Sequence, residues 1–349
     1  MTPEQRVQAI LDQLSIEYAS DPITKAKARA MFGGYVQRWF VDKRQWKIVA
    51  VEQEFSGPII NPATNWPSRT FVLKGKSDLI VEDQDEKVWY VEHKTAAEIS
   101  GNYIDILPMD LQLNLSLPLL SREIGRPIHG VIFNAIAKTK WRLKKTERPF
   151  EYEERLDEQY QSAEMFHREK LQLSASDIRG AYGDLWNITK LIRDAINANT
   201  FHRNTGSCFD YFRKCPYFDL CVAGKERCDH IETSFYEHRP ASVELSQPGL
   251  YDSVTGKRTL TQSAIKAFLA CPQKYYYRYI KQIVKRSDVE HALHFGQAIH
   301  AALAAWYGDD DPVNYFKENE YESASNQIDT ANLQAGKPDD LSVRPAESW

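Results

Sequence analysis

Residues 75–95 read GKSDLIVEDQDEKVWYVEHKT. Two runs rich in apolar residues flank the polar turn 83–86, a pattern that predicts a β-hairpin. Side chains alternate between the faces of a strand, so Glu92 and Lys94 project together and His93 projects the other way. The stretch therefore predicts a sheet that presents an acid and a cation on one face.

The flanking sequence extends the hairpin into a larger sheet between helices. Alternating or continuous apolar patterns predict strands over 46–55, 70–81, 87–94 and 129–137. Helical spacing predicts helices within 1–44, over 105–123 and within the charged region 150–200. Pro118 should kink or end the second of these. We expect an α/β (α+β) fold: a mixed central sheet flanked by helices, with a cysteine-rich helical C-terminal part.

The bulk composition narrows the classes of protein. The chain has 349 residues, 42% of them hydrophobic, enough for one large domain or two small ones. No apolar run approaches the ~20 residues of a membrane span, and no leader-like apolar segment opens the chain. We therefore expect a cytoplasmic protein with no membrane partner. The net charge of −4 argues against a protein that coats nucleic acid non-specifically.

A local basic groove is still compatible with this charge. Residues 138–148 supply candidates for DNA contacts, with one aromatic side chain as a stacking surface. These candidates are Lys138, Lys140, Trp141, Arg142, Lys144 and Lys145. A solvated surface explains the same charges equally well.

Asp78 lies 14 residues before Glu92, so the hairpin can bring the two carboxylates together as oxygen ligands for Mg²⁺. A metal ion and Lys94 together could provide the activated water and the charge stabilisation that phosphodiester hydrolysis needs. Taken alone, the triplet is explained as well by a strand-end acid and an exposed ion pair worth under about 1 kcal/mol.

The surrounding residues favour the catalytic interpretation. With Gly75-Lys-Ser-Asp78, Glu92-His-Lys-Thr95 and Gln112 in the following helix, the chain resembles the RecB-like branch of the PD-(D/E)xK nucleases, which includes CRISPR-associated exonucleases. The resemblance implies a restriction-endonuclease-like fold. It also implies metal ligation by Asp78, Glu92, Glu54 and the backbone carbonyl of His93, activation of phosphate or water by Lys94, and a supporting role for Gln112. The family commonly has tyrosine where this chain has Ser116.

The motifs that open the family's domain occur here near the other end. They are Ser263 with Cys271-Pro-Gln-Lys-Tyr-Tyr276, and Gly296-Gln-Ala-Ile-His300, which makes His300 a metal-site candidate. Either the chain is a circularly permuted module, which requires neighbouring termini, or it joins parts of two modules. We expect a nuclease core over 1–232 with its cysteine-rich segment at 201–230, a linker over 233–258, the displaced helical segment over 259–307, and a polar tail over 308–349.

Four of the five cysteines lie within residues 208–228, at gaps longer than the usual zinc knuckle. The resemblance implies a 4Fe-4S cluster held by Cys208, Cys215, Cys221 and Cys271. Zinc, or free thiols packed among the neighbouring aromatic residues, are alternatives.

These features together favour a DNA nuclease. The resemblance implies an exonuclease that hydrolyses DNA with Mg²⁺ or Mn²⁺. It would act on single strands or free ends, in recombination, repair or phage DNA processing. The alternative is a DNA-binding or scaffolding protein that keeps the nuclease fold without turnover. No His-Glu-x-x-His pair supports a zinc hydrolase.

Overall fold

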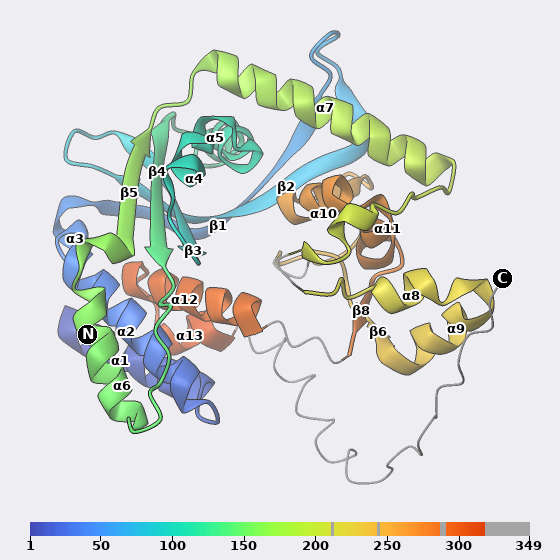
Figure 1. Ribbon diagram of the computed structural model, residues 1–349. Coiled ribbons are helices and arrows are strands. Elements are labelled where there is room, and N and C mark those ends of the chain that lie inside the picture. Colours follow the sequence, from blue (N-terminus) through green and yellow to red (C-terminus); the bar gives the residue numbers. More distant parts are fainter. Residues whose placement is uncertain (211–212, 243–244, 287–290, 318–349) are drawn as a thin grey trace, which may run out of the picture.

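The computed structural model describes residues 1–210, 213–242, 245–286 and 291–317. Its centre is a mixed sheet whose main strands lie side by side in chain order (Figure 1). They are β1 (Lys47–Ile60), β2 (Pro67–Glu82), β3 (Val88–Ala96), β4 (Ile128–Ala137) and β5 (Phe166–Leu171). Only β3 and β4 among these neighbours are parallel, and the short β7 (Arg258–Leu260) adds a parallel pair to the far end of β2. The expected mixed α/β architecture is confirmed.

The hairpin of β2 and β3 is closed by Asp83. Its Oδ1 accepts the backbone N–H groups of Asp85 and Lys87, and its Oδ2 accepts Nε1–H of Trp89 at 2.8 Å. The β2–β3 ladder runs only from Glu82 opposite Val88 to Leu79 opposite Val91. Beyond that pair β3 continues along β4, so β2 and β3 separate where Asp78 and Glu92 follow.

One face of the sheet is covered by helices from both ends of the sequence. They are α1 (Pro3–Glu17), α2 (Pro22–Trp39), α6 (Pro149–Tyr160), α12 (His291–Tyr307) and α13 (Pro312–Lys317). The blue and red helices of Figure 1 lie together here. The Arg6 guanidinium on α1 donates to the carbonyl oxygens of Ala305 at 2.5 Å and Asp310 at 2.7 Å. The two ends of the described chain therefore share one core.

The other face is covered by α5 (Leu111–Glu123), α7 (Ala175–Asn197) and α10 (Gln262–Ala270). The helix predicted over 105–123 is divided: α4 (Gly101–Asp105) and a 3₁₀ turn (Leu107–Met109) precede α5, which Asp110 caps by accepting the N–H of Leu113. Pro118 does not end α5. Its missing N–H costs one helical hydrogen bond, but buried leucines on both sides of it anchor the helix to the sheet.

The region expected to be helical over 150–200 contains α6 and α7, but a strand that was not expected separates them. Between α6 and α7 the chain forms β5, which pairs with β4 at the edge of the sheet. Four of its six residues are His167, Arg168, Glu169 and Lys170, so its polar character hides the strand pattern. An edge strand tolerates such residues because one of its sides is not covered by another strand.

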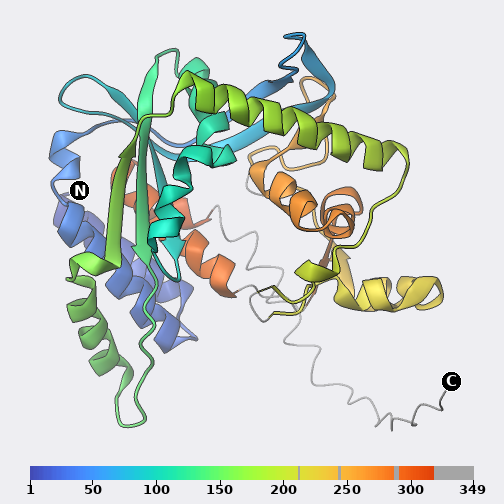
Figure 2. The ribbon, with the colours of Figure 1, turned by 45° about the horizontal axis from the view of Figure 1, so that its top comes forward.

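The cysteine-rich part lies beside the sheet, and α7 spans from the sheet towards it (Figures 1 and 2). It contains α8 (Phe218–Val222), α9 (Gly224–Phe235), α11 (Pro272–Tyr275), a π-helical turn (Tyr276–Ile280), and the pair of β6 (Tyr236–His238) with β8 (Ile283–Lys285). A small aromatic core holds it together. The region expected as a linker over 233–258 thus begins with the end of α9 and with β6.

Two further expectations concern the ends and the membrane. The tail expected over 308–349 contains α13 at its start, and residues 318–349 lie outside the described residues. A short α3 (Asp42–Gln45) joins α2 to β1. None of the helices in the described part of the chain has the length and apolar character needed to cross a bilayer.

Candidate active site

Asp78 occupies the gap that opens where β2 and β3 separate. Its Oδ2 accepts the backbone N–H of His93 at 2.6 Å, a bond from side chain to backbone where the ladder has ended. Its Oδ1 lies 3.2 Å from Nδ1 of His300, which α12 brings from 222 residues further along the chain. The structure therefore brings together Asp78 and the histidine of the displaced segment.

The charges of this pair favour ionisation of both groups. Burial raises the pKa of Asp78, but the adjacent His300 and the nearby positive charge of Lys94 outweigh it and hold that pKa well below its usual range. Burial lowers the pKa of His300, and the Asp78 carboxylate more than offsets this, so the net shift is upward. Each group of the pair therefore favours the charged form of the other.

Glu92 lies on β3 one step past the last β2–β3 pair, and it is only 1% exposed. One carboxylate oxygen accepts the Tyr90 hydroxyl, and the other accepts Nε2–H of Gln112 at 2.7 Å and forms an ion pair with Lys94. Burial raises the pKa of Glu92 to about 7, and the negative charge of Asp78 adds to the rise. Lys94 limits that rise because its charge favours the carboxylate form.

Gln112 links the acid to the cation. From the first turn of α5 its amide nitrogen donates to Glu92, and its Oε1 accepts from Nζ of Lys94 at 3.4 Å. Burial lowers the pKa of Lys94, but the carboxylates of Glu92 and Asp78 outweigh it, so the ammonium stays protonated. Glu92 and Lys94 form an ion pair, so their side chains project from the same face of β3, as strand alternation predicts.

Metal ligation by Glu54 stays a prediction, and in the structure its carboxylate is bound to Ser246. Both of its oxygens accept from Ser246, the hydroxyl at 2.9 Å. Glu52, in contrast, lines one small pocket with Asp78 and His300, and its Oε2 is 2.5 Å from Nζ of Lys76. Burial raises the pKa of Glu52, and the nearby Asp78 carboxylate raises it further.

Sequence reasoning missed Glu52 because its position beside Asp78 depends on the strand register. The β1–β2 register passes from Val51 opposite Leu79 to Gln53 opposite Ser77, and Glu52 has a positive φ of 52°. This backbone conformation is uncommon for a residue with a side chain. This register places Glu52 opposite Asp78, and no pattern in the sequence had singled it out.

His93 turns away from the acids, as strand alternation predicts. Its Nδ1 lies 3.1 Å from Nδ2 of Asn134, and its ring stacks against Tyr307 at 6.1 Å between centroids. Burial lowers the pKa of His93 to about 3, so the ring is neutral. Its backbone N–H is the group that contacts Asp78, and metal ligation by its carbonyl stays a prediction.

No three His, Cys, Asp or Glu side chains within the described residues are grouped closely enough to hold a metal ion. The two acids Asp78 and Glu92 do not point their oxygens at one common position. The oxygens of Glu92 contact Tyr90, Gln112 and Lys94, whereas Asp78 contacts His300. The four cysteines predicted as cluster ligands are likewise not arranged as a metal site.

These four cysteines are nevertheless neighbours. The N–H of Cys215 donates to the carbonyl of Cys208 at 2.8 Å. Burial raises the pKa of Cys221 to about 11, and the thiol groups of Cys215, Cys271 and Cys208 contribute to the rise. All five cysteines are free thiols. The fold thus gathers residues 208, 215 and 221 with residue 271, as the prediction requires, without a formed metal site.

The basic segment 138–148 joins β4 to α6 without regular secondary structure. Lys140 forms an ion pair with Glu98 at 3.1 Å, and Trp141, 41% exposed, packs under the guanidinium of Arg155. Arg142, Lys144 and Lys145 are exposed. The contacts fit both interpretations of this segment, and its binding of DNA stays a prediction.

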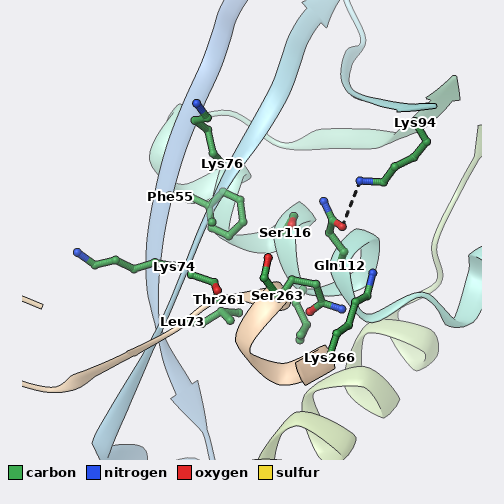
Figure 3. Close-up of a pocket in the computed structure, with 13 residues that line it drawn as sticks. Phe55, Leu73, Lys74, Lys76, Lys94, Gln112, Ser116, Thr261, Ser263 and Lys266 are labelled. Carbon is green, nitrogen blue, oxygen red and sulfur yellow. Dashed lines mark hydrogen bonds between the residues drawn. The ribbon is translucent and has the colours of Figure 1, made fainter. Parts of the chain in front are cut away.

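A cavity of about 310 Å³ extends from Lys94 and Gln112 to the first turn of α10 (Figure 3). Strand β2, helix α5 and helix α10 form its walls. Figure 3 shows Lys76 and Lys266 on its rim together with Lys94, whose ammonium is joined to Gln112. Lys94 and Gln112 therefore open onto a cavity that polar and apolar residues line.

A family model of the PD-(D/E)XK nuclease superfamily matches residues 2–222 and 259–344, most of the chain. The chain belongs to the PD-(D/E)XK nuclease superfamily. Both matched parts of this superfamily member contribute to the site described above, since Asp78, Glu92 and Lys94 lie in the first and His300 in the second. The unmatched residues 223–258 include the whole region expected as a linker. No curated protein matches the chain.

Proposed function

We propose that this superfamily member is a metal-dependent DNA nuclease that degrades strands from free ends, in recombination, repair or the processing of phage DNA. The main support for the proposal is one observation. Asp78, with His300 bound to it, lies near the Glu92–Lys94 pair where β2 and β3 separate. Two acids, a cation and an imidazole thus converge where two interior strands of the sheet separate.

The donor atoms fit Mg²⁺ or Mn²⁺. Carboxylate oxygens are the ligands that these ions prefer, and Asp78, Glu92 and Glu52 supply them around one gap, with His300 beside them. Glu92 would exchange one of its present contacts for the metal. A bound ion would lower the pKa of a coordinated water and neutralise part of the phosphate charge.

The other residues would position and stabilise the reacting groups. Lys94 keeps its positive charge because two carboxylates raise its pKa, so it can stabilise negative charge that develops on the phosphate. Gln112 fixes the Lys94 ammonium and the Glu92 carboxylate relative to each other through its two hydrogen bonds. His300 holds the Asp78 carboxylate in one orientation.

We further propose that the chain is one circularly permuted module. The 3.2 Å contact of His300 with Asp78 and the bonds of Arg6 to residues 305 and 310 support it, because both join the two ends of the sequence within one core. A chain made of parts of two modules would have no reason to bury α12 against α1 and α2.

Degradation of end-labelled linear DNA tests the proposed activity. Wild-type protein with Mg²⁺ or Mn²⁺ should shorten the DNA, and Asp78→Ala and Lys94→Ala should lose at least about a hundredfold in rate, the size expected for a group that stabilises charge in the transition state. Asp85→Ala and Lys87→Ala are matched controls, since both residues lie in the exposed turn of the same hairpin. Both controls should keep the wild-type rate.

The same assay separates the alternatives. A circular single strand should resist wild-type protein if the activity needs an end, and its cleavage would indicate an endonuclease. Binding of DNA without any metal-dependent cleavage by wild type would favour the alternative of a non-catalytic DNA-binding or scaffolding protein. Equal rates for wild type, Asp78→Ala and Lys94→Ala would refute catalysis at this site.

We also propose that the four neighbouring cysteines hold a 4Fe-4S cluster, which would tie residues 208–221 to residue 271. Anaerobically purified protein should absorb near roughly 400 nm. Cys271→Ser should remove this absorbance, whereas Cys228→Ser should keep it. Colourless protein that contains zinc would identify a zinc site, and metal-free protein would leave four free thiols.

A further inference from the structure

The lining of the cavity beside the candidate catalytic residues is cationic and contains no acidic residue. Four of its lining residues are lysines: Lys74, Lys76, Lys94 and Lys266. Three of them have carboxylate partners, Lys74 with Asp252 at 2.6 Å, Lys76 with Glu52, and Lys94 with Glu92. Within the described ranges Lys266 has no carboxylate partner, and its side chain is exposed. Its charge is available to a ligand in the cavity.

Hydrogen-bond donors lie next to this lysine. Ser263 is in the first turn of α10, and Figure 3 shows its hydroxyl directed into the cavity. Thr261 caps the helix by accepting the N–H of Ala264, which leaves the N–H groups of residues 262 and 263 without a helical partner. Helix N-termini favour anions. Lys266, Ser263 and this helix end together fit a phosphate group.

The opposite wall is apolar. Phe55, Leu73 and Leu115 line it, and the small side chain of Ser116, four residues after Gln112 on the same face of α5, leaves the space between the two walls open. An amphipathic cavity of this kind fits a whole nucleotide, with the phosphate at the lysine and the sugar and base against the apolar side. A paired nucleotide cannot enter, because its base is stacked inside the duplex.

We propose that this cavity binds the nucleotide next to the scissile phosphodiester of a single nucleic-acid strand, with Lys266 and Ser263 holding its phosphate. The assignment of the neighbouring phosphodiester as scissile rests on the proposed function. The binding itself rests on the cavity alone, which Lys94 and Gln112 join to the candidate active site.

Fluorescence anisotropy with a labelled single-stranded oligonucleotide in EDTA tests this subsite. Lys266→Ala should weaken binding roughly fivefold and reduce the steepness of log K against log salt by about 0.7, the contribution of one phosphate contact to a single strand. Ser116→Leu, which fills the cavity without changing charge, should also weaken binding. Lys190→Ala removes the same charge from an exposed position on α7 and should leave both quantities unchanged. Circular dichroism checks that each variant is folded.

Two results would overturn the subsite. The first is affinity and salt dependence of Lys266→Ala and Ser116→Leu equal to those of Lys190→Ala. The second is a loss for a blunt duplex as large as the loss for the single strand. Since EDTA prevents hydrolysis, these results do not depend on the nuclease proposal. Conversely, an inactive wild type that still binds through Lys266 would refute the nuclease proposal and keep the subsite.

Discussion

Replacing Glu92 by glutamine removes a buried charge while keeping the volume of the side chain. Burial raises the pKa of Glu92 to about 7 from an ordinary value of 4.5. Between these pH values the folded protein keeps a proton that the unfolded chain releases, so stability falls as the pH rises through this window. The size of the shift corresponds to about 3 kcal/mol of stability, lost once the pH exceeds the folded pKa.

Urea unfolding at pH 5 and pH 8 without divalent metal measures this loss. At pH 5 both side chains are neutral in the folded state, so Glu92→Gln and wild type should differ by less than about 1 kcal/mol. At pH 8 only wild type carries the buried charge, and the variant should be more stable by about 3 kcal/mol. All other titrating groups are common to both proteins and largely cancel in the comparison.

Glu98→Gln is the matched control, because Glu98 is 71% exposed and its ion pair with Lys140 is on the surface. Its effect should stay within about 0.5 kcal/mol at both pH values. Mg²⁺ at a hundredfold excess over its Kd should add about 2.7 kcal/mol to wild type at pH 8, and less to Glu92→Gln. A stability difference between Glu92→Gln and wild type that does not change with pH would refute the reasoning.

Three further predictions concern single contacts. Gln112→Leu should lower the rate of DNA hydrolysis about tenfold to a hundredfold, because it removes hydrogen bonds to two charged groups, and single-turnover kinetics measure this. Arg168→Ala should destabilise the fold by about 3 kcal/mol in urea unfolding, since it leaves a buried carboxylate without its partner. Gly34→Ala should cost about 1–3 kcal/mol because its Cβ would lie 2.5 Å from Cβ of Tyr160, whereas Gly33→Ala on the same helix meets no atom within 4 Å and should not destabilise.

Local spacing predicts the part of the site that lies on one hairpin. The polar turn 83–86 fixes the pairing of two strands, and strand alternation then places Glu92 and Lys94 on one face and His93 on the other. These relations span few residues, so the pattern in the sequence is sufficient to predict them. Gln112 became a candidate only through the resemblance, and the structure places it in the first turn of α5.

Site residues that are distant in the sequence could be brought together only once the fold was known. His300 became a candidate only through a resemblance, since a histidine on an apolar helix has no periodic signature of metal binding. Glu52 was not considered from the sequence, because only the β1–β2 register shows that it lies opposite Asp78. The strand at Phe166–Leu171 was missed because charged residues are tolerated on a sheet edge.

The most direct test of the central claim, one nuclease site assembled within a single chain from both of its ends, is DNA hydrolysis by a mixture of two variants. Asp78→Ala and His300→Ala should each be inactive with Mg²⁺, and an equimolar mixture should stay inactive because no chain contains both residues. Wild type at the same concentration should degrade the DNA. Activity that returns on mixing would show that His300 serves the site of another chain, and full activity of either variant alone would contradict the composite site.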